Sequence, residues 1–155
     1  MSVETLLQTL QPVFEALKDL DLTDAAAARV NLAETFPPDS AVVREARELF
    51  TRGLEEGWLC DREAGGARFS RVVKTGDATG GYSVDAVQLS GPGPGHRHTK
   101  GEVDLCFARE GDPRFDGHPE GWVVFGADSE HVPTVTGGTM DILYFLPGGV
   151  IEWKR

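Results

Sequence analysis

The sequence lacks several features that would assign it to a familiar class. It has only two cysteines, Cys60 and Cys106, among 155 residues, which is too few for the disulfide framework of a small secreted domain. No apolar run follows a basic segment near the N-terminus, and no stretch approaches the roughly 20 apolar residues of a membrane-spanning helix. From these absences we expect a soluble cytoplasmic protein.

Positive charge is also scarce. Fifteen Lys and Arg residues face 25 Asp and Glu residues, so the formal net charge is −10 at pH 7. Nucleic-acid binding depends on basic patches, and an anionic membrane surface attracts the same charges. We therefore expect neither nucleic acid nor membrane as a partner. The glycine-rich segments match no phosphate-binding pattern, neither G-x-x-x-x-G-K-[ST] nor a strand-linked G-x-G-x-x-G, and so predict turns.

Two patterns divide the chain. Up to residue 59, apolar residues recur at intervals of three and four, as at Leu6, Leu10, Val13 and Leu17, which predicts amphipathic helices. Beyond residue 60, short β-branched and aromatic segments alternate with Gly, Pro and Asp, which is typical of an antiparallel sandwich or small barrel. The sequence thus predicts a mainly β protein, with an N-terminal helical region at 1–59 packed on a β-barrel at 60–155.

Residues that cap or break helices and residues that favour turns give the expected boundaries of the helices and strands. Pro12 should break or kink the first helix, Asp24 or Thr23 should cap the next, and Gly57 should end the last. Strands are expected near residues 68–74, 82–89, 102–109, 121–125, 140–146 and 150–154, with turns at 65–66, 76–81, 91–95, 111–117, 137–138 and 147–149.

The most informative stretch is GPGPGHRHTKGEVDLCFAREG, residues 91–111. It spaces His96, His98 and Glu102 as H-x-H-x-x-x-E. Residues i and i+2 of a strand share a face, and a tight break at 99–101 would let Glu102 join both imidazoles. His131, after the apolar run at 122–125, is the candidate fourth ligand. Imidazole nitrogens with one carboxylate suit a divalent transition metal such as Fe, Mn, Ni or Zn.

The number of protein ligands leaves two kinds of metal site open. Four protein ligands on an octahedral Fe(II), Mn or Ni ion leave two positions for substrate or water. Four protein ligands on a tetrahedral Zn ion close the site and make it structural.

The strand after Glu102 carries further candidates. Glu102, Asp104 and Cys106 share one face, and Val103, Leu105 and Phe107 share the other, which needs an apolar cover. Asp104 could accept a hydrogen bond from a ligand imidazole or act as a general base. Alternatively, Asp104 is a solvated carboxylate on the strand with no role in the site. Cys106 is expected to be a small buried hydrophobe rather than a nucleophile.

Other candidates lie farther along the chain or before the metal motif. His118, in the loop FDGHPEG, could donate a proton at the mouth of the pocket, or it could be a surface histidine. Arg71 and Arg114 could bind a carboxylate substrate through their guanidinium forks, or they could be solvated surface residues. Tyr144 shares a strand with Asp141, and sequence alone leaves open which of them faces the cavity.

The metal motif resembles the cupin signature. In that signature a glycine precedes His-x-His, Glu and a second glycine, and a later motif supplies a glycine and the last histidine. Here these positions read Gly91, His96, His98, Glu102, Gly111, Gly126 and His131. This chain lacks a proline ahead of Gly126 and an Asn at the usual distance after His131. The resemblance implies a cupin-like (jelly-roll) antiparallel β-barrel.

A narrower resemblance covers almost the full chain. The segments GHPEGWVVFG and ILYFLPGG, with RFSRVV and the preceding helical region, are similar to the small bacterial family that includes 4-hydroxylaminobenzoate lyase. The resemblance implies conversion of 4-hydroxylaminobenzoate to 3,4-dihydroxybenzoate with release of ammonia. The alternatives are an oxygen-dependent cupin dioxygenase and a non-catalytic module that binds a small ligand. The partners expected are a small aromatic substrate and, from the amphipathic helices, a second copy in a homodimer.

Overall fold

The computed structural model describes residues 2–153 except 65, 94 and 150, and it leaves the side chains of residues 98, 152 and 153 undescribed. The helices come first along the chain: α1 (Val3–Thr9), α2 (Gln11–Lys18), α3 (Ala25–Thr35) and α4 (Ala41–Glu56). The strands follow: β1 (Arg62–Ala64), β2 (Ala67–Val73), β3 (Tyr82–Pro92), β4 (His96–His98), β5 (Glu102–Phe115), β6 (Gly121–Phe125), β7 (Ser129–His131), β8 (Thr134–Pro147) and β9 (Glu152–Trp153), with a short 3-10 turn η1 (Asp77–Thr79) after β2.

The helix boundaries follow local hydrogen bonding as predicted. Pro12 lies in the first turn of α2, where its missing N–H would have no intrahelical partner in any case. The Asp24 carboxylate caps α3 by accepting a hydrogen bond from the backbone N–H of Ala27 at 3.1 Å. Gly57 ends α4 in the left-handed conformation, with φ of 83°. The predicted break, cap and stop are all confirmed.

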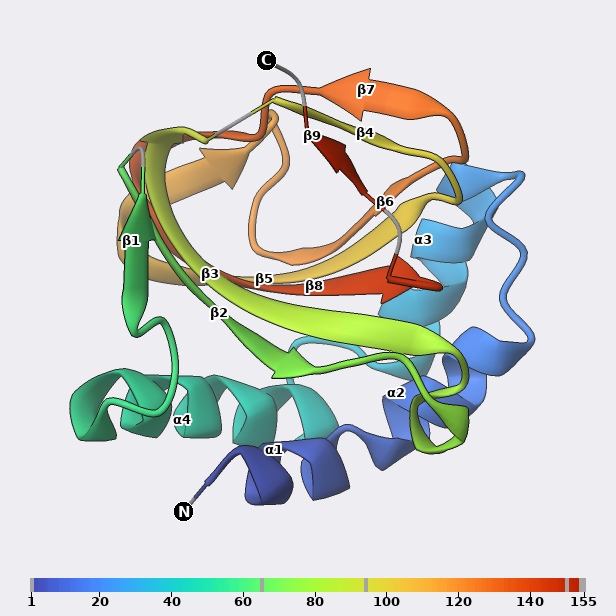
Figure 1. Cartoon of the computed structure of the whole chain (residues 1–155), viewed down its shortest axis with the longest axis horizontal. Helices are drawn as coiled ribbons and strands as arrows, with labels where there is room; N and C mark the ends of the chain where they lie inside the picture. The colour runs from blue at the N-terminus through green and yellow to red at the C-terminus, as the bar shows by residue number, and fades with distance from the viewer. Residues whose placement is uncertain (1, 65, 94, 150, 154–155) are drawn as a thin grey trace.

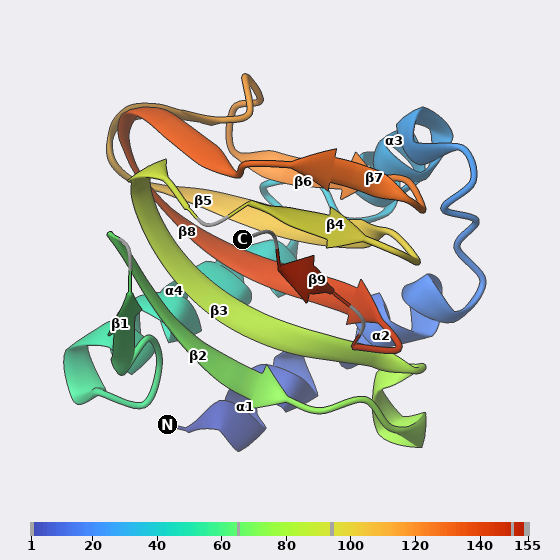
Figure 2. The same ribbon diagram turned by 45° about the horizontal axis from the view of Figure 1, so that its top comes forward.

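The strands form two antiparallel sheets. One has the order β1-β2-β3-β8-β5-β6 and the other the order β7-β4-β9. In Figures 1 and 2, α1 and α4 run along the outer side of the larger sheet, while β4, β7 and β9 lie over its opposite side. The predicted mainly β, jelly-roll-like fold with N-terminal helices is confirmed. The strands do not close into one continuous barrel, because β4 and β7 pair with each other instead of extending the larger sheet.

The two faces of the larger sheet bury different cores. On the outer face, Val103, Leu105 and Phe107 of β5 pack into an apolar cluster with the helices. On the inner face, Cys106 belongs to a second cluster together with Ile142 and Tyr144 of β8. The strict alternation along β5 therefore places Glu102 and Asp104 on the inner face. This arrangement confirms the predicted division of the strand and its cover by the helices.

One predicted turn is wrong and another is confirmed only in part. Residues 137–138 do not reverse the chain, because Gly137 and Gly138 lie within β8. Of the segment 111–117, Gly111 lies within β5, and only Asp116 and Gly117 form the turn that follows this strand. The two strands shift register beside these glycines, and a Cβ atom on Gly138 would overlap the carbonyl oxygen of Glu110. The glycines are required because the backbones approach closely at a bulge, which in sequence resembles a turn.

The helices and the sheet share one apolar core. Phe14 of α2 contacts Phe145 of β8 edge to face, with ring centroids 6.0 Å apart, and Phe50 of α4 contacts Phe107 of β5 at 6.4 Å. The division of the chain at residue 59 into two domains stays a prediction. Among the described residues, no helix has the length and apolar character needed to cross a membrane.

Candidate active site

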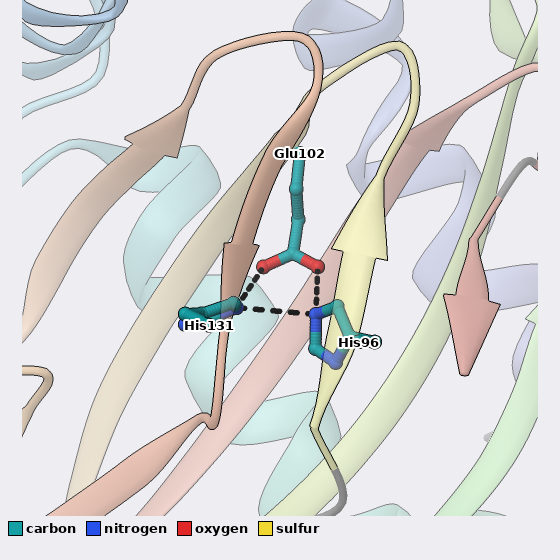
Figure 3. A group of neighbouring side chains, drawn as sticks. All are labelled: His96, Glu102 and His131. Atoms are coloured by element: carbon teal, nitrogen blue, oxygen red, sulfur yellow. Dashed lines mark hydrogen bonds and ion pairs between the residues drawn. The ribbon is translucent and has the colours of Figure 1, made fainter. Parts of the chain in front are cut away.

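Three side chains from different strands converge inside the protein: His96 of β4, Glu102 of β5 and His131 of β7 (Figure 3). The Nε2 atom of His96 lies 3.1 Å from Oε1 of Glu102 and 3.1 Å from Nε2 of His131. Nε2 of His131 lies 3.8 Å from Oε2 of Glu102. One ligand atom from each residue thus falls within 4.8 Å of the other two, close enough for all three to bind one ion.

Strand pairing explains how residues 35 positions apart meet. β4 pairs with β7 in a register that places His96 directly opposite His131. Gly101, with φ of 100°, turns the chain between β4 and β5 so that Glu102 begins the next strand. A Cβ atom at Gly101 would lie 3.0 Å from the carbonyl oxygen of Phe125, so this turn favours glycine for both its space and its conformation.

The contacts of His131 indicate which of its ring nitrogens carries the hydrogen. Its Nδ1 atom lies in close contact with a carboxylate oxygen of Asp116. An ionised carboxylate can only accept a hydrogen bond, so this contact favours the tautomer of a neutral imidazole that carries its hydrogen on Nδ1 and has its lone pair on Nε2. That lone pair lies 3.8 Å from a carboxylate oxygen of Glu102. A cation bound between this nitrogen and this oxygen would be attracted by both.

The donor set fits a divalent transition metal. Two imidazole nitrogens and one carboxylate oxygen are the ligand types that Zn, Fe, Mn and Ni accept. His96 and Glu102 are fully buried, and an anionic carboxylate at such depth needs a compensating positive charge. The predicted ligands His96, Glu102 and His131 are therefore brought together. The side chain of His98 lies outside the described residues, so its part in the site stays a prediction.

Asp104 lies on the inner face of β5, two residues after Glu102, and its side chain is fully buried. Neither of its carboxylate oxygens has a hydrogen-bond partner among the described residues. Burial, followed by the negative charge of Glu102, raises the pKa of this carboxyl well above its usual value. Burial likewise raises the pKa of the neighbouring Cys106 thiol, as expected of a buried apolar cysteine and not of a nucleophile.

A cavity of about 690 Å³ opens beside the cluster. His96 and Tyr144 belong to its wall, so the cavity reaches the three-residue site. Its other walls come from the start of β1, from β2 and β3, and from the loops around them, and include Trp58, Arg62, Phe69, Arg71, Asp85 and Val87. A cavity of this size, with aromatic, apolar and charged side chains in its walls, suits a small aromatic molecule that carries a polar group.

Strand register arranges the polar residues of the inner face in a row. Arg71 of β2 pairs with Asp85 of β3, Asp85 pairs with Tyr144 of β8, and Tyr144 pairs with Asp104 of β5. Directly paired residues of antiparallel strands project from the same face. The row therefore runs across the sheet from the cavity mouth toward the candidate metal ligands.

Arg71 is positioned by its neighbour in that row. Its Nε atom donates a hydrogen bond to Asp85, and its side chain is 46% exposed at the cavity. Burial raises the pKa of Asp85, and the positive charge of Arg71 opposes that rise. No described residue accepts a hydrogen bond from the two Nη groups of Arg71. Asp85 thus engages only the Nε donor of the guanidinium, and the Nη donors remain for a carboxylate ligand.

The structure places the remaining predicted residues apart from this cavity. Arg114 lies near the end of β5 and is exposed, and His118 lies in the loop before β6, where its backbone pairs with that of Phe115. Neither is among the described residues that line the cavity. Asp141, the strand neighbour of Tyr144, accepts hydrogen bonds from Arg109 and Gln88, which leaves Tyr144 as the cavity residue of β8.

Sequence reasoning missed two residues of the site, Asp85 and Asp116. Asp85 lies between Val84 and Ala86 in a strand. A single carboxylate between apolar residues of a strand was the signal that could have indicated a functional residue. Asp116 precedes Gly117, and an Asp-Gly pair indicates a turn. Its contact with His131, 15 residues later, has no signal in the local pattern.

The sequence is similar to a family of known enzymes. The family model PnbB, described as 4-hydroxylaminobenzoate lyase, matches residues 8–153. A 4-hydroxylaminobenzoate lyase of Nocardioides sp. (strain LMS-CY) is 27% identical over 133 residues, which cover 79% of this chain and 78% of that protein. The protein of the same name from Pseudomonas putida is 26% identical over 140 residues, with 79% and 80% covered.

Solved structures show only distant likeness. An RmlC-like cupin protein from Ralstonia eutropha has a TM-score of 0.46 at 14% identity, over 59% of this chain and 62% of that one. A putative acetylacetone dioxygenase from Methylibium petroleiphilum also has a TM-score of 0.46, at 13% identity over 59% and 68%. Likeness this distant does not bear on function. The match to the family model is stronger, because it covers nearly the whole sequence. The chain therefore belongs to the 4-hydroxylaminobenzoate lyase family.

Proposed function

We propose that this protein converts 4-hydroxylaminobenzoate to 3,4-dihydroxybenzoate and ammonia. The observation that carries the proposal is the convergence of His96, Glu102 and His131 at the end of an aromatic-walled cavity in a chain of this family. The reaction takes up one water and releases one ammonia, so its atoms balance without an oxidant or reductant.

A divalent transition metal would be held by His96, Glu102, His131 and, from the spacing of the sequence, His98. A metal bound there would supply Lewis acidity toward an oxygen of the substrate. The geometry leaves the protein with two further tasks, which are to orient the substrate in the cavity and to handle protons during loss of the hydroxyl group and addition of water.

Residues of the polar row are suited to those tasks. Arg71 at the mouth would bind the ring carboxylate and direct the hydroxylamino group inward. Tyr144, on the wall beside His96, would donate its hydroxyl hydrogen to the departing oxygen. Asp104 is buried behind Tyr144 in the row and does not line the cavity among the described residues. Its role would be to exchange a proton with its neighbours without contacting the substrate.

A direct assay tests the proposal. The purified full-length chain, loaded with each of Fe(II), Mn(II), Ni(II) and Zn(II) in turn, is incubated with 4-hydroxylaminobenzoate under air and under nitrogen. We expect 3,4-dihydroxybenzoate and ammonia in equal amounts at the same rate in both atmospheres. Turnover that consumes oxygen would instead indicate a dioxygenase. Binding without product, with every metal, would indicate a non-catalytic module.

Replacing Arg71 by glutamine should weaken substrate binding. Glutamine keeps a polar side chain but is shorter and loses the charged fork, and a charge-assisted hydrogen bond contributes about 1.5–3 kcal/mol. Since every 1.4 kcal/mol is a factor of ten, we expect KM for 4-hydroxylaminobenzoate to rise roughly 10- to 100-fold with a smaller change in kcat. Steady-state kinetics measure both constants.

A neighbouring arginine and a neutral substrate provide the controls for this result. Arg68 lies on the same strand and is exposed, but it projects from the opposite face and does not line the cavity, so Arg68→Gln should leave KM unchanged. For N-phenylhydroxylamine, which lacks the carboxylate, wild type and Arg71→Gln should have equal KM values. An equal loss with both substrates would show that Arg71 does not bind the carboxylate.

A further inference from the structure

Asp116 occupies a constrained position between β5 and β6. Its backbone has φ of 47° and is followed by Gly117 at 85°, so the loop turns tightly in the left-handed region. One carboxylate oxygen contacts Nδ1 of His131. The other accepts a hydrogen bond from the backbone N–H of Thr134 at 2.9 Å. The N–H of Asp116 in turn donates to the carbonyl oxygen of Thr134 at 2.9 Å.

These bonds hold the carboxylate from two sides. Thr134 begins β8, three residues after His131, so the backbone bonds anchor Asp116 to the same segment that carries the imidazole. The carboxylate cannot rotate away from His131 without giving up the Thr134 N–H. The acceptor is therefore fixed relative to the ring it contacts, and it is largely shielded, with 19% of its side chain exposed.

Aromatic walls restrict the ring of His131 itself. The Phe125 ring lies 4.2 Å from it between centroids, and the Phe115 ring lies 6.1 Å away. With Nδ1 directed at Asp116, Nε2 is directed at His96 and Glu102. A ring flip would place a carbon atom against the carboxylate and remove Nε2 from the cluster.

We propose that Asp116 is a positioning residue that selects the tautomer of His131, holding the hydrogen on Nδ1 so that the Nε2 lone pair is directed at the cluster before any metal binds. This inference rests on the metal site of the proposed function but not on its substrate or reaction. It extends the site to a loop outside both metal motifs of the sequence.

The chemistry of an amide shows what the substitution Asp116→Asn would do. An asparagine has one acceptor oxygen, whereas Asp116 uses two oxygens for two donors. With its oxygen on the Thr134 N–H, the amide would present its NH₂ group to His131 and donate to Nδ1. His131 would then carry its hydrogen on Nε2, pointing at His96 and Glu102, and that nitrogen could not bind a metal ion.

The test compares the full-length wild type and Asp116→Asn after removal of metal with a chelator. Zinc affinity is measured by competition with a chromogenic chelator, and the tautomer of His131 is read from the ¹⁵N chemical shifts of its ring, assigned with a His131→Gln sample. We expect the hydrogen to move from Nδ1 to Nε2 and the zinc affinity to fall roughly 10- to 100-fold, as for other carboxylates that orient ligand histidines.

Asp128→Asn is the matched control. Asp128 also has a left-handed backbone, with φ of 60°, and it pairs with Arg97 at 2.9 Å on the surface. Its substitution removes one charge at the same type of backbone position without touching His131, so tautomer and affinity should both match wild type. Unfolding temperatures of all three proteins identify any general loss of stability.

The outcomes separate positioning from a purely structural role. A wild-type tautomer in Asp116→Asn overturns the proposal, whether or not the zinc affinity falls, because a lower affinity would then come from loosened structure. A changed tautomer with unchanged zinc affinity also overturns it. A negative lyase assay leaves the test intact, since neither the tautomer nor the zinc affinity depends on the reaction.

Discussion

His96→Ala should purify without stoichiometric metal and should lose turnover of 4-hydroxylaminobenzoate by about a thousandfold or more. His96 is the centre of the cluster, since its Nε2 atom lies 3.1 Å from both Glu102 and His131. Without it, only two of the three converging described side chains remain to bind a metal. A metal that lowers the activation free energy by about 4 kcal/mol accelerates the reaction by about three powers of ten.

Elemental analysis and a product assay measure the two losses in the same samples. His118→Ala is the control for metal content, because it also removes one imidazole but from a loop outside the cluster, and it should bind metal as wild type does. Since His96 is fully buried, circular dichroism must show that the variant is folded. His131→Ala, on a different strand, should repeat both losses. A folded His96→Ala protein that turns over substrate without metal would contradict the proposed site.

Tyr144→Phe should lower kcat by about a hundredfold and leave KM nearly unchanged. The substitution removes only the hydroxyl group, and the ring can still stack on Phe115, whose centroid lies 6.3 Å away. Burial raises the pKa of Tyr144 well above its usual value, so the phenol keeps its hydrogen at neutral pH and can donate it. A proton donor acting in the transition state typically contributes about 10²- to 10⁴-fold.

The second tyrosine of the chain provides a matched control. Tyr82 is as buried as Tyr144, each with 6% of its surface exposed, and burial raises the pKa of Tyr82 to about 12. Tyr82, however, packs in the helix-facing core, on the other side of the larger sheet. Tyr82→Phe should therefore leave kcat and KM unchanged. Equal kcat values for Tyr144→Phe and wild type would show that the hydroxyl takes no part in the reaction.

Local patterns predicted much of the fold because they reflect contacts between near neighbours. The Asp24 cap spans three residues, and the alternation along β5 needs only the two-residue period of a strand. The same locality explains the errors at Gly111 and Gly138. A glycine required by a distant backbone has the same appearance in sequence as one required by a turn.

The candidate ligands were also accessible from the sequence, since His, Glu and glycine at fixed spacing form a motif. The surroundings of the ligands were not. Arg71, Asp85, Tyr144 and Asp104 form a row only through the register of four strands. A shift of one residue in any pairing would turn a member of the row to the outer face.

The sequence by itself determined the helix boundaries, the two faces of β5 and the identity of the candidate metal ligands. Each depends on residue types at short, regular separations. Only the tertiary structure decided that Asp116 contacts His131, that Asp85 accepts a hydrogen bond from Arg71, and that Tyr144, not Asp141, faces the cavity. These relations depend on which strands pair and in what register, and that is set by the packing of the whole core, which no local segment encodes.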